Sequence, residues 1–153
     1  GMLRKLDNGL ARMAEKVTVV DPVFRLSISL IFIIGGLGHF FAHQHMLGRM
    51  HLSPWRSHVE IIGNPSVLLW LSGAIFIAAG ITLALGYMTR ISAAALFLTL
   101  VPITVAVHVA PGHTGPLFKN VAILGSLIYL FVRGPGRWAL DHQLQPFNTH
   151  RDR

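Results

Sequence analysis

The chain has 153 residues, of which 52% are hydrophobic and only 12% are charged, with a mean hydropathy of +0.56. Because soluble domains usually carry about 25% charged residues, this composition excludes an ordinary soluble domain and indicates a single-domain integral membrane protein. The formal net charge is +7, but the basic residues follow the edges of the apolar stretches, which argues against a nucleic-acid-binding surface.

The N-terminal segment has the pattern of an amphipathic helix. Its apolar residues are spaced alternately three and four apart, at Leu3, Leu6, Leu10, Met13, Val17 and Val20. The basic residues lie off this stripe, as in a helix that rests in the headgroup layer. A dimeric coiled coil has the same period but needs more heptads. We therefore expect residues 1–22 to form an amphipathic interfacial helix, with Asp21 and Pro22 as the cap and first residue of the next helix.

Four apolar stretches free of Lys, Arg, Asp and Glu follow. They run from Arg25 to Arg49, from Glu60 to Arg90, from Arg90 to Lys119 and from Lys119 to Arg133. A spanning helix needs about 20 apolar residues, so the first three stretches are long enough and the last is marginal. We predict an all-α integral membrane protein with spans at about 24–43, 67–88, 91–110 and 116–132. Short connections, apart from 44–66, favour an antiparallel four-helix transmembrane bundle.

Positive charge is concentrated on one side of these spans. That side holds ten of the 13 basic residues: Arg4, Lys5, Arg12, Lys16, Arg25, Arg90, Arg133, Arg137, Arg151 and Arg153. The other side holds Arg49, Arg56 and Lys119. Because positive flanks favour the cytoplasmic side, we expect both termini inside. No cleavage site follows the first stretch, so we expect it to remain as an uncleaved span.

Histidines follow the opposite distribution. Seven of the nine lie on the outer side or in the outer half of a span, namely His39, His43, His45, His51, His58, His108 and His113. His39 and His43 are four apart and would share a helix face. Such a pair could bind a metal, relay protons or hydrogen-bond a quinone carbonyl. A metal is the least favoured, because the chain has no cysteine and only Glu60 is acidic on that side.

The third and fourth spans add polar groups at the same depth. Pro102 interrupts the third span, in which Thr104 and His108 are four apart, and Lys119 and Asn120 open the fourth. Ionisable groups at membrane depth are candidates for function. We expect a ligand-binding or proton-relay site formed by His39, His43, His108, Lys119 and Asn120. No catalytic residue is assigned.

Several short strings carry a resemblance to a known family. They are Arg25 with Leu30–Phe32 and Gly35, then Gly80, Leu85-Gly86 and Thr89-Arg90, then His108 with Phe118–Asn120, and finally Gly134–Asp141. On these residues the chain resembles the DoxX family of small four-span bacterial membrane proteins over 23–141, which leaves 142–153 as a cytoplasmic tail. Many members carry a glutamate near the position of Phe76, which is apolar here. A proton or cation role for that glutamate therefore does not carry over.

The resemblance also implies a functional class. The family takes its name from a likeness to a subunit of a thiosulfate:quinone oxidoreductase, and some members are linked to oxidative-stress complexes. It implies a redox subunit in the bacterial cytoplasmic (inner) membrane, with quinone as the candidate cofactor and an oxidoreductase or a second copy of the chain as candidate partners. The alternative is a non-enzymatic scaffold, assembly or lipid-interacting protein. A small-molecule carrier is less favoured, because the broken, repeated helices of transporters are not evident.

Overall fold

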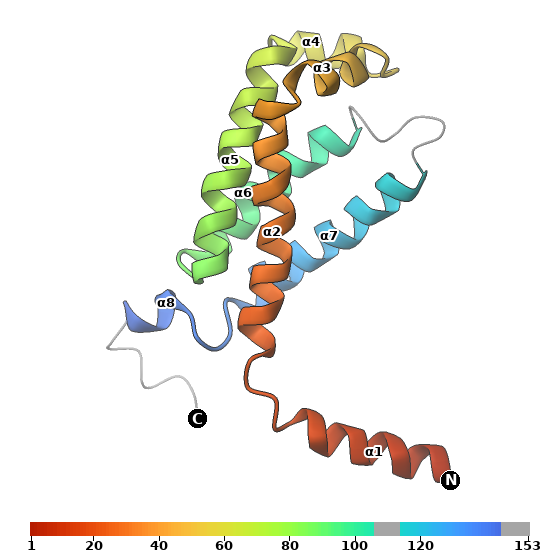
Figure 1. The fold of residues 1–153 in the computed structure, drawn as a ribbon, viewed down its shortest axis with the longest axis vertical. Coiled ribbons are helices and arrows are strands. Elements are labelled where there is room, and N and C mark those ends of the chain that lie inside the picture. The colour runs from red at the N-terminus through yellow and green to blue at the C-terminus, as the bar shows by residue number, and fades with distance from the viewer. Residues whose placement is uncertain (106–113, 145–153) are drawn as a thin grey trace.

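A computed structural model describes residues 1–105 and 114–144, and this part of the chain is helical without strands (Figure 1). Its helices are α1 Met2–Ala14, α2 Val20–Phe41, α3 His43–His51, α4 Arg56–Ile62, α5 Pro65–Leu85, α6 Thr89–Ile103, α7 Thr114–Arg133 and α8 Leu140–Gln143.

Three of these helices, α2, α5 and α7, are long and apolar enough to cross a membrane. The last apolar stretch, marginal by its charge-free length, forms the 20-residue helix α7. The third forms α6, which has 15 residues and so extends for roughly 22 Å, less than the bilayer core of about 30 Å. The rest of the span expected there falls partly outside the described residues, so a membrane crossing by the third stretch, and with it the four-span bundle, stays a prediction.

The helices that follow one another along the chain also pack together. Helix α2 contacts α5, α5 contacts α6, and α6 contacts α7. Helices α3 and α4 lie at one end of this group, which we call the α3–α4 end (residues 42–64). Helix α8 and the start of α2 lie at the other, which we call the tail end (residues 18–25, 86–90 and 133–144) (Figure 1).

Glycines allow α2 and α5 to approach closely. A Cβ on Gly36 would lie 2.8 Å from the carbonyl oxygen of Gly73, and one on Gly73 would lie 2.7 Å from the Cβ of His39. Gly80 lies against α2 in the same way, with Ile33 3.0 Å from the added atom. Small residues serve this purpose in membrane helices because lipid provides little hydrophobic drive for association. This crossing brings the end of α2 directly against α5.

The core is apolar and lies between α2, α5, α6 and α7. Phe32 and Phe76 pack edge to face, with ring centroids 5.0 Å apart. Leu83 and Leu96 are fully buried in the same cluster. Phe76 is therefore part of the apolar core.

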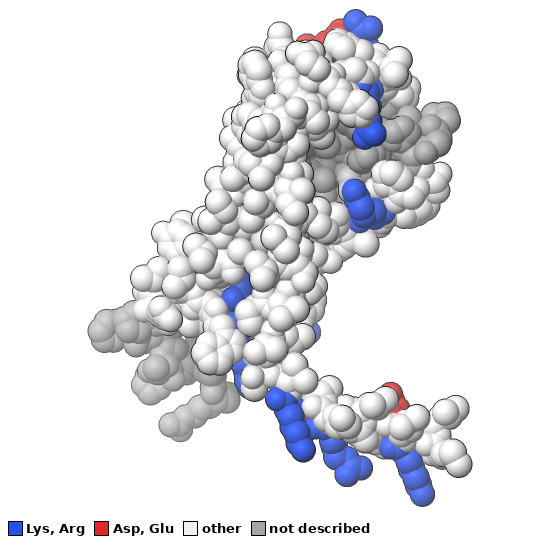
Figure 2. Space-filling model, in the orientation of Figure 1, with Lys and Arg blue, Asp and Glu red and all other residues white. Residues whose placement is uncertain are grey.

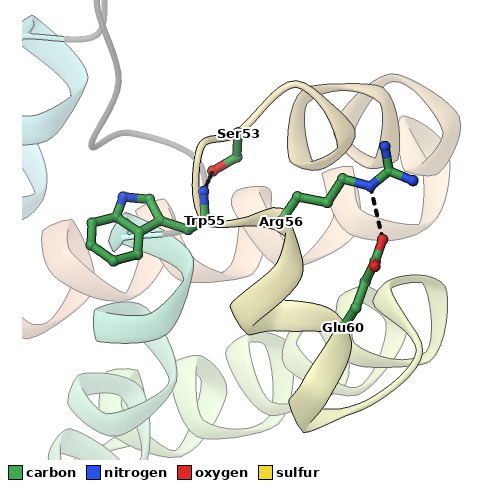
Figure 3. Close-up of polar contacts among 4 residues, drawn as sticks. All are labelled: Ser53, Trp55, Arg56 and Glu60. Atoms are coloured by element: carbon green, nitrogen blue, oxygen red, sulfur yellow. Dashed lines mark hydrogen bonds and ion pairs between the residues drawn. The ribbon is translucent and has the colours of Figure 1, made fainter.

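The connection between the first two spans forms two short helices. The Arg56 Nε donates to the Glu60 carboxylate at 2.8 Å across one turn of α4, and the Trp55 ring points away from this pair (Figure 3). The Asn64 side chain then caps α5, accepting from the Ser66 N–H at 2.9 Å. The ion pair thus lies within α4, and the Asn64 cap marks where the connection ends and α5 begins.

Candidate functional site

His39 lies near the end of α2, and its ring is buried against α5 with only 2% of its surface exposed. Its Nδ1 is 2.9 Å from both the Leu69 carbonyl oxygen and the Ser72 hydroxyl, and this hydroxyl also donates to the Leu69 carbonyl. Because a carbonyl only accepts, Nδ1 carries the proton, and Nε2 is an acceptor in the neutral ring. Within residues 1–105 and 114–144, Nε2 has no hydrogen-bond partner.

His43, the first residue of α3, contacts α5 through Nε2, whereas His39 contacts α5 through Nδ1. Its Nδ1 is 3.1 Å from the His39 carbonyl oxygen, and its Nε2 is 2.6 Å from the Ser66 hydroxyl. The carbonyl again places the proton on Nδ1, so Ser66 donates to Nε2. The ring stacks on Trp70, with centroids 4.6 Å apart. The described residues contain no group of three side chains that could hold a metal ion.

A second polar pair joins α7 to α6. Asn120 is 3% exposed, and its Nδ2 donates to the Thr104 hydroxyl at 2.9 Å, which in turn donates to the Leu100 carbonyl at 2.7 Å. Lys119 is exposed. His108 lies outside the described residues, so the convergence of all five candidate residues stays a prediction.

The two histidines and Asn120 thus have different partners. Both histidines bind α5, through the hydroxyls of Ser66 and Ser72, whereas Asn120 binds α6. Sequence reasoning overlooked the two serines. The signal for them was the presence of hydroxyls in the first half of an otherwise apolar span, where such groups need a buried partner.

A cavity of about 260 Å³ lies between the α3–α4 end and helices α5 and α6. Most of its lining is apolar, and its polar lining residues are Arg49, Ser72 and Thr99. Pro102, which removes a backbone donor from α6, forms part of the wall. Because Ser72 also contacts His39, the cavity and the buried histidine are separated by a single side chain.

Arg25 organises the tail end, although the sequence indicated only a charge at the membrane edge. Its side chain is 1% exposed. The guanidinium donates to the carbonyls of Pro135, Arg137 and Trp138, the last two at 2.8 and 2.7 Å. We call residues 134–141 the tail clasp, because through Arg25 they tie the end of α7 to the first turns of α2.

Asp141 completes the tail clasp at the start of α6. Its carboxylate accepts from the N–H of Met88 at 2.7 Å, and from the N–H and hydroxyl of Thr89 at 3.1 and 2.7 Å. Burial acts to raise the pKa of Asp141, but the hydrogen bonds from Thr89 and Met88 outweigh it and hold the pKa below its ordinary value. Asp141 of the tail clasp thus supplies the N-terminal cap that no neighbouring side chain provides for α6.

Asp21 does not cap α2, and this prediction from the sequence was wrong. Helix α2 begins at Val20 without a side-chain cap. The Asp21 carboxylate instead accepts from the Arg137 N–H at 2.9 Å. The physical reason is that the tail clasp passes directly beside Asp21, where Gly136 has a φ of +71° and a Cβ would overlap the carboxylate. The Arg137 N–H of the tail clasp thereby has the Asp21 carboxylate as a charged acceptor.

The model of the DoxX family matches residues 21–109, which is more than half of the chain. The chain belongs to the DoxX family. It is 28% identical over 135 residues to the uncharacterized membrane protein Rv3486 of Mycobacterium tuberculosis, covering 78% of each protein. It is 26% identical over 125 residues to the inner membrane protein YqjF of Escherichia coli, covering 80% of this chain and 89% of that protein. No solved structure matches the chain.

The DoxX match contains most of the site described above. It includes Arg25, both buried histidines and the residues that line the cavity, from α2 to α6. The tail clasp lies beyond residue 109, yet its carbonyls are the partners of Arg25 inside the match. Residues that follow the DoxX match in sequence therefore supply the hydrogen-bond acceptors of Arg25 within it.

Proposed function

We propose that this DoxX-family membrane protein is a membrane subunit of a redox system, and that it binds a quinone headgroup beside His39. The supporting observation is a buried imidazole whose Nδ1–H is held by α5 and whose Nε2 has no partner within the described residues. A neutral histidine in this state can accept a proton or a hydrogen bond from a quinol. The chain has no cysteine, so its electrons would pass to a bound cofactor or a partner oxidoreductase.

The proposed placement has four spans in the bacterial inner membrane, with both termini inside. Residues 23–141 form the membrane domain and residues 142–153 a cytoplasmic tail, while residues 1–22 are an interfacial segment that contains helix α1 (Met2–Ala14). Helix α1 supports this, because none of its residues is buried and Leu3 is 80% exposed. Its basic side chains project from the edge that faces away from the bundle (Figure 2).

The test is titration of the purified protein with the reduced (quinol) form of a short-chain ubiquinone analogue, whose hydroxyl can donate to Nε2, followed by the change in tryptophan fluorescence. Trp70 reports on the site because its ring stacks on His43. The variant His39→Gln can still donate to the Leu69 carbonyl but loses the ring nitrogen, so binding should weaken about tenfold, the value of one hydrogen bond. His45→Gln is the matched control, because His45 is exposed on α3. Equal affinities in both variants would refute the site.

A non-enzymatic role in lipid organisation or assembly is the second candidate. It is favoured by α1, which carries exposed apolar side chains at Met2, Leu6 and Met13. Deletion of residues 2–16 separates the two functions. The quinone titration should be unchanged if the redox site lies in the bundle. A lipid or assembly function should be lost, because the deletion removes the helix that contacts the membrane surface.

A further inference from the structure

The cavity beside α5 and α6 is lined by neither His39 nor His43, so the proposed quinone site does not account for it. Its volume of about 260 Å³ is near the lower end of small-molecule pockets, which begin at about 300 Å³. Ile62 lines the cavity and is 72% exposed. The cavity therefore opens at the surface of α4.

The interior of this cavity offers almost only hydrocarbon. Its two hydroxyls are already engaged, because Ser72 donates to the Leu69 carbonyl at 3.0 Å and Thr99 donates to the Ala95 carbonyl at 2.7 Å. The other interior walls are aliphatic side chains, methionines and Pro102. Such a surface favours an apolar chain and provides few groups to orient a polar molecule.

The cavity also has a positive charge that no carboxylate in residues 1–105 and 114–144 neutralises. Arg49 lines the cavity and is exposed. Glu60 is the only acidic residue between Asp21 and Asp141, and it pairs with Arg56 at 2.8 Å. No carboxylate of this end remains for Arg49. An arginine beside an apolar cavity is suited to bind an anionic oxygen group, with phosphate a preferred partner of the guanidinium.

We propose that this cavity binds an anionic phospholipid, with one acyl chain between α4, α5 and α6 and the phosphate on Arg49. This inference is independent of the redox role, because neither buried histidine takes part in it. The exposed apolar residues beside the cavity mouth, Ile61 at 83% and Ile62 at 72%, would contact neighbouring lipid. The proposal thus unites three observations that otherwise have no common cause, namely the apolar interior, the lateral opening and the unneutralised arginine.

The test measures lipid binding to the full-length protein in detergent micelles, by native mass spectrometry and by the rise in melting temperature. Phosphatidylglycerol and phosphatidylcholine with the same acyl chains are compared. Arg49→Gln removes the cation, and Arg56→Gln is its control, because Arg56 does not line the cavity. Leu71→Trp fills the cavity from a lining position that is 56% exposed. Val67→Trp is its control on the same helix, because Val67 is 55% exposed and does not line the cavity.

We expect phosphatidylglycerol to bind more tightly than phosphatidylcholine to the unmodified protein. Arg49→Gln should remove this preference and weaken the binding of phosphatidylglycerol about fivefold. Leu71→Trp should weaken the binding of both lipids. The two control variants should bind both lipids as the unmodified protein does. Equal effects of Arg49→Gln and Arg56→Gln, or no preference between the lipids, would overturn the proposal. Displacement of the lipid by the ubiquinone analogue would also overturn it, because the cavity would then belong to the quinone. If His39→Gln loses quinone binding but still binds phosphatidylglycerol as the unmodified protein does, the lipid proposal is supported.

Discussion

Replacing Arg25 with methionine tests whether the tail clasp holds the bundle together. Arg25 donates to three main-chain carbonyls and is 1% exposed. Hydrogen bonds to charged groups contribute at least about 1.5 kcal/mol each, so the three together contribute roughly 4 to 5 kcal/mol. Methionine fills similar space without a donor and removes the cost of burying a charge, which offsets part of this loss. We expect a net loss of about 3 kcal/mol in the free energy of unfolding.

The measurement is an unfolding titration with sodium dodecyl sulfate in mixed micelles, followed by far-UV circular dichroism. Arg90→Met is the matched control. Arg90 is an exposed arginine of the same tail end and donates one hydrogen bond, from Nε to the Phe131 carbonyl at 3.0 Å. Its loss should cost less than about 1 kcal/mol.

A second readout separates an open clasp from a general loss of stability. Trypsin cleaves after arginine, and the tail clasp contains Arg137, whose N–H and carbonyl are both bonded to α2 residues. Cleavage there should accelerate in Arg25→Met at detergent concentrations where the helices remain folded. The reasoning is refuted if the two arginine variants lose the same stability, or if cleavage after Arg137 is unchanged in Arg25→Met.

Three further predictions follow from other parts of the structure. Pro102→Ala restores a backbone donor to α6 and changes the cavity wall, so thermal stability should hold or rise while phosphatidylglycerol binding falls. Asp141 has a pKa below its ordinary value, so it stabilises the protein at neutral pH and this contribution is lost as the pH falls below about 4. Melting temperatures between pH 7 and pH 3 should therefore fall less steeply in Asp141→Asn. Cysteine at Ser53 should react with an impermeant thiol reagent from outside the cell and cysteine at Thr149 should not; the reverse pattern would invert the proposed topology.

The extent of the main helices could be predicted from the sequence because it depends on runs of uncharged residues. Helices α2, α5 and α7 begin and end within a few residues of the expected bounds. The close contact of α2 with α5 also left a sequence signal, in Gly73 and Gly80 on one face. The sequence placed His39 and His43 on one face of a single helix, whereas α2 ends at Phe41 and His43 begins α3. Their contacts with Ser72 and Ser66 of α5 were not foreseen.

The tail clasp could not be predicted, because its bonds join side chains to main-chain atoms. Every residue has a carbonyl, so nothing in the composition of residues 135–138 marks them as the partners of Arg25. The same reason explains the error at Asp21, since an aspartate before a proline has the sequence pattern of a helix cap whether or not a distant N–H is closer. Only the glycines at 134 and 136, with φ of +80° and +71°, left a sign of an unusual chain path.

The partners of Arg25 are separated from it by more than a hundred residues, since Pro135 follows Arg25 by 110 positions. This separation imposes an order on biogenesis. Arg25 leaves the ribosome with the first span, while the carbonyls that accept its hydrogen bonds are made more than a hundred residues later. Arg25 lies near the end of its span, where its guanidinium can reach the headgroup layer before these partners exist, and so avoids the cost of about 3 kcal/mol that applies at the centre of the bilayer. A chain that stops before residue 135 therefore contains the first span but lacks the three carbonyls that accept hydrogen bonds from Arg25.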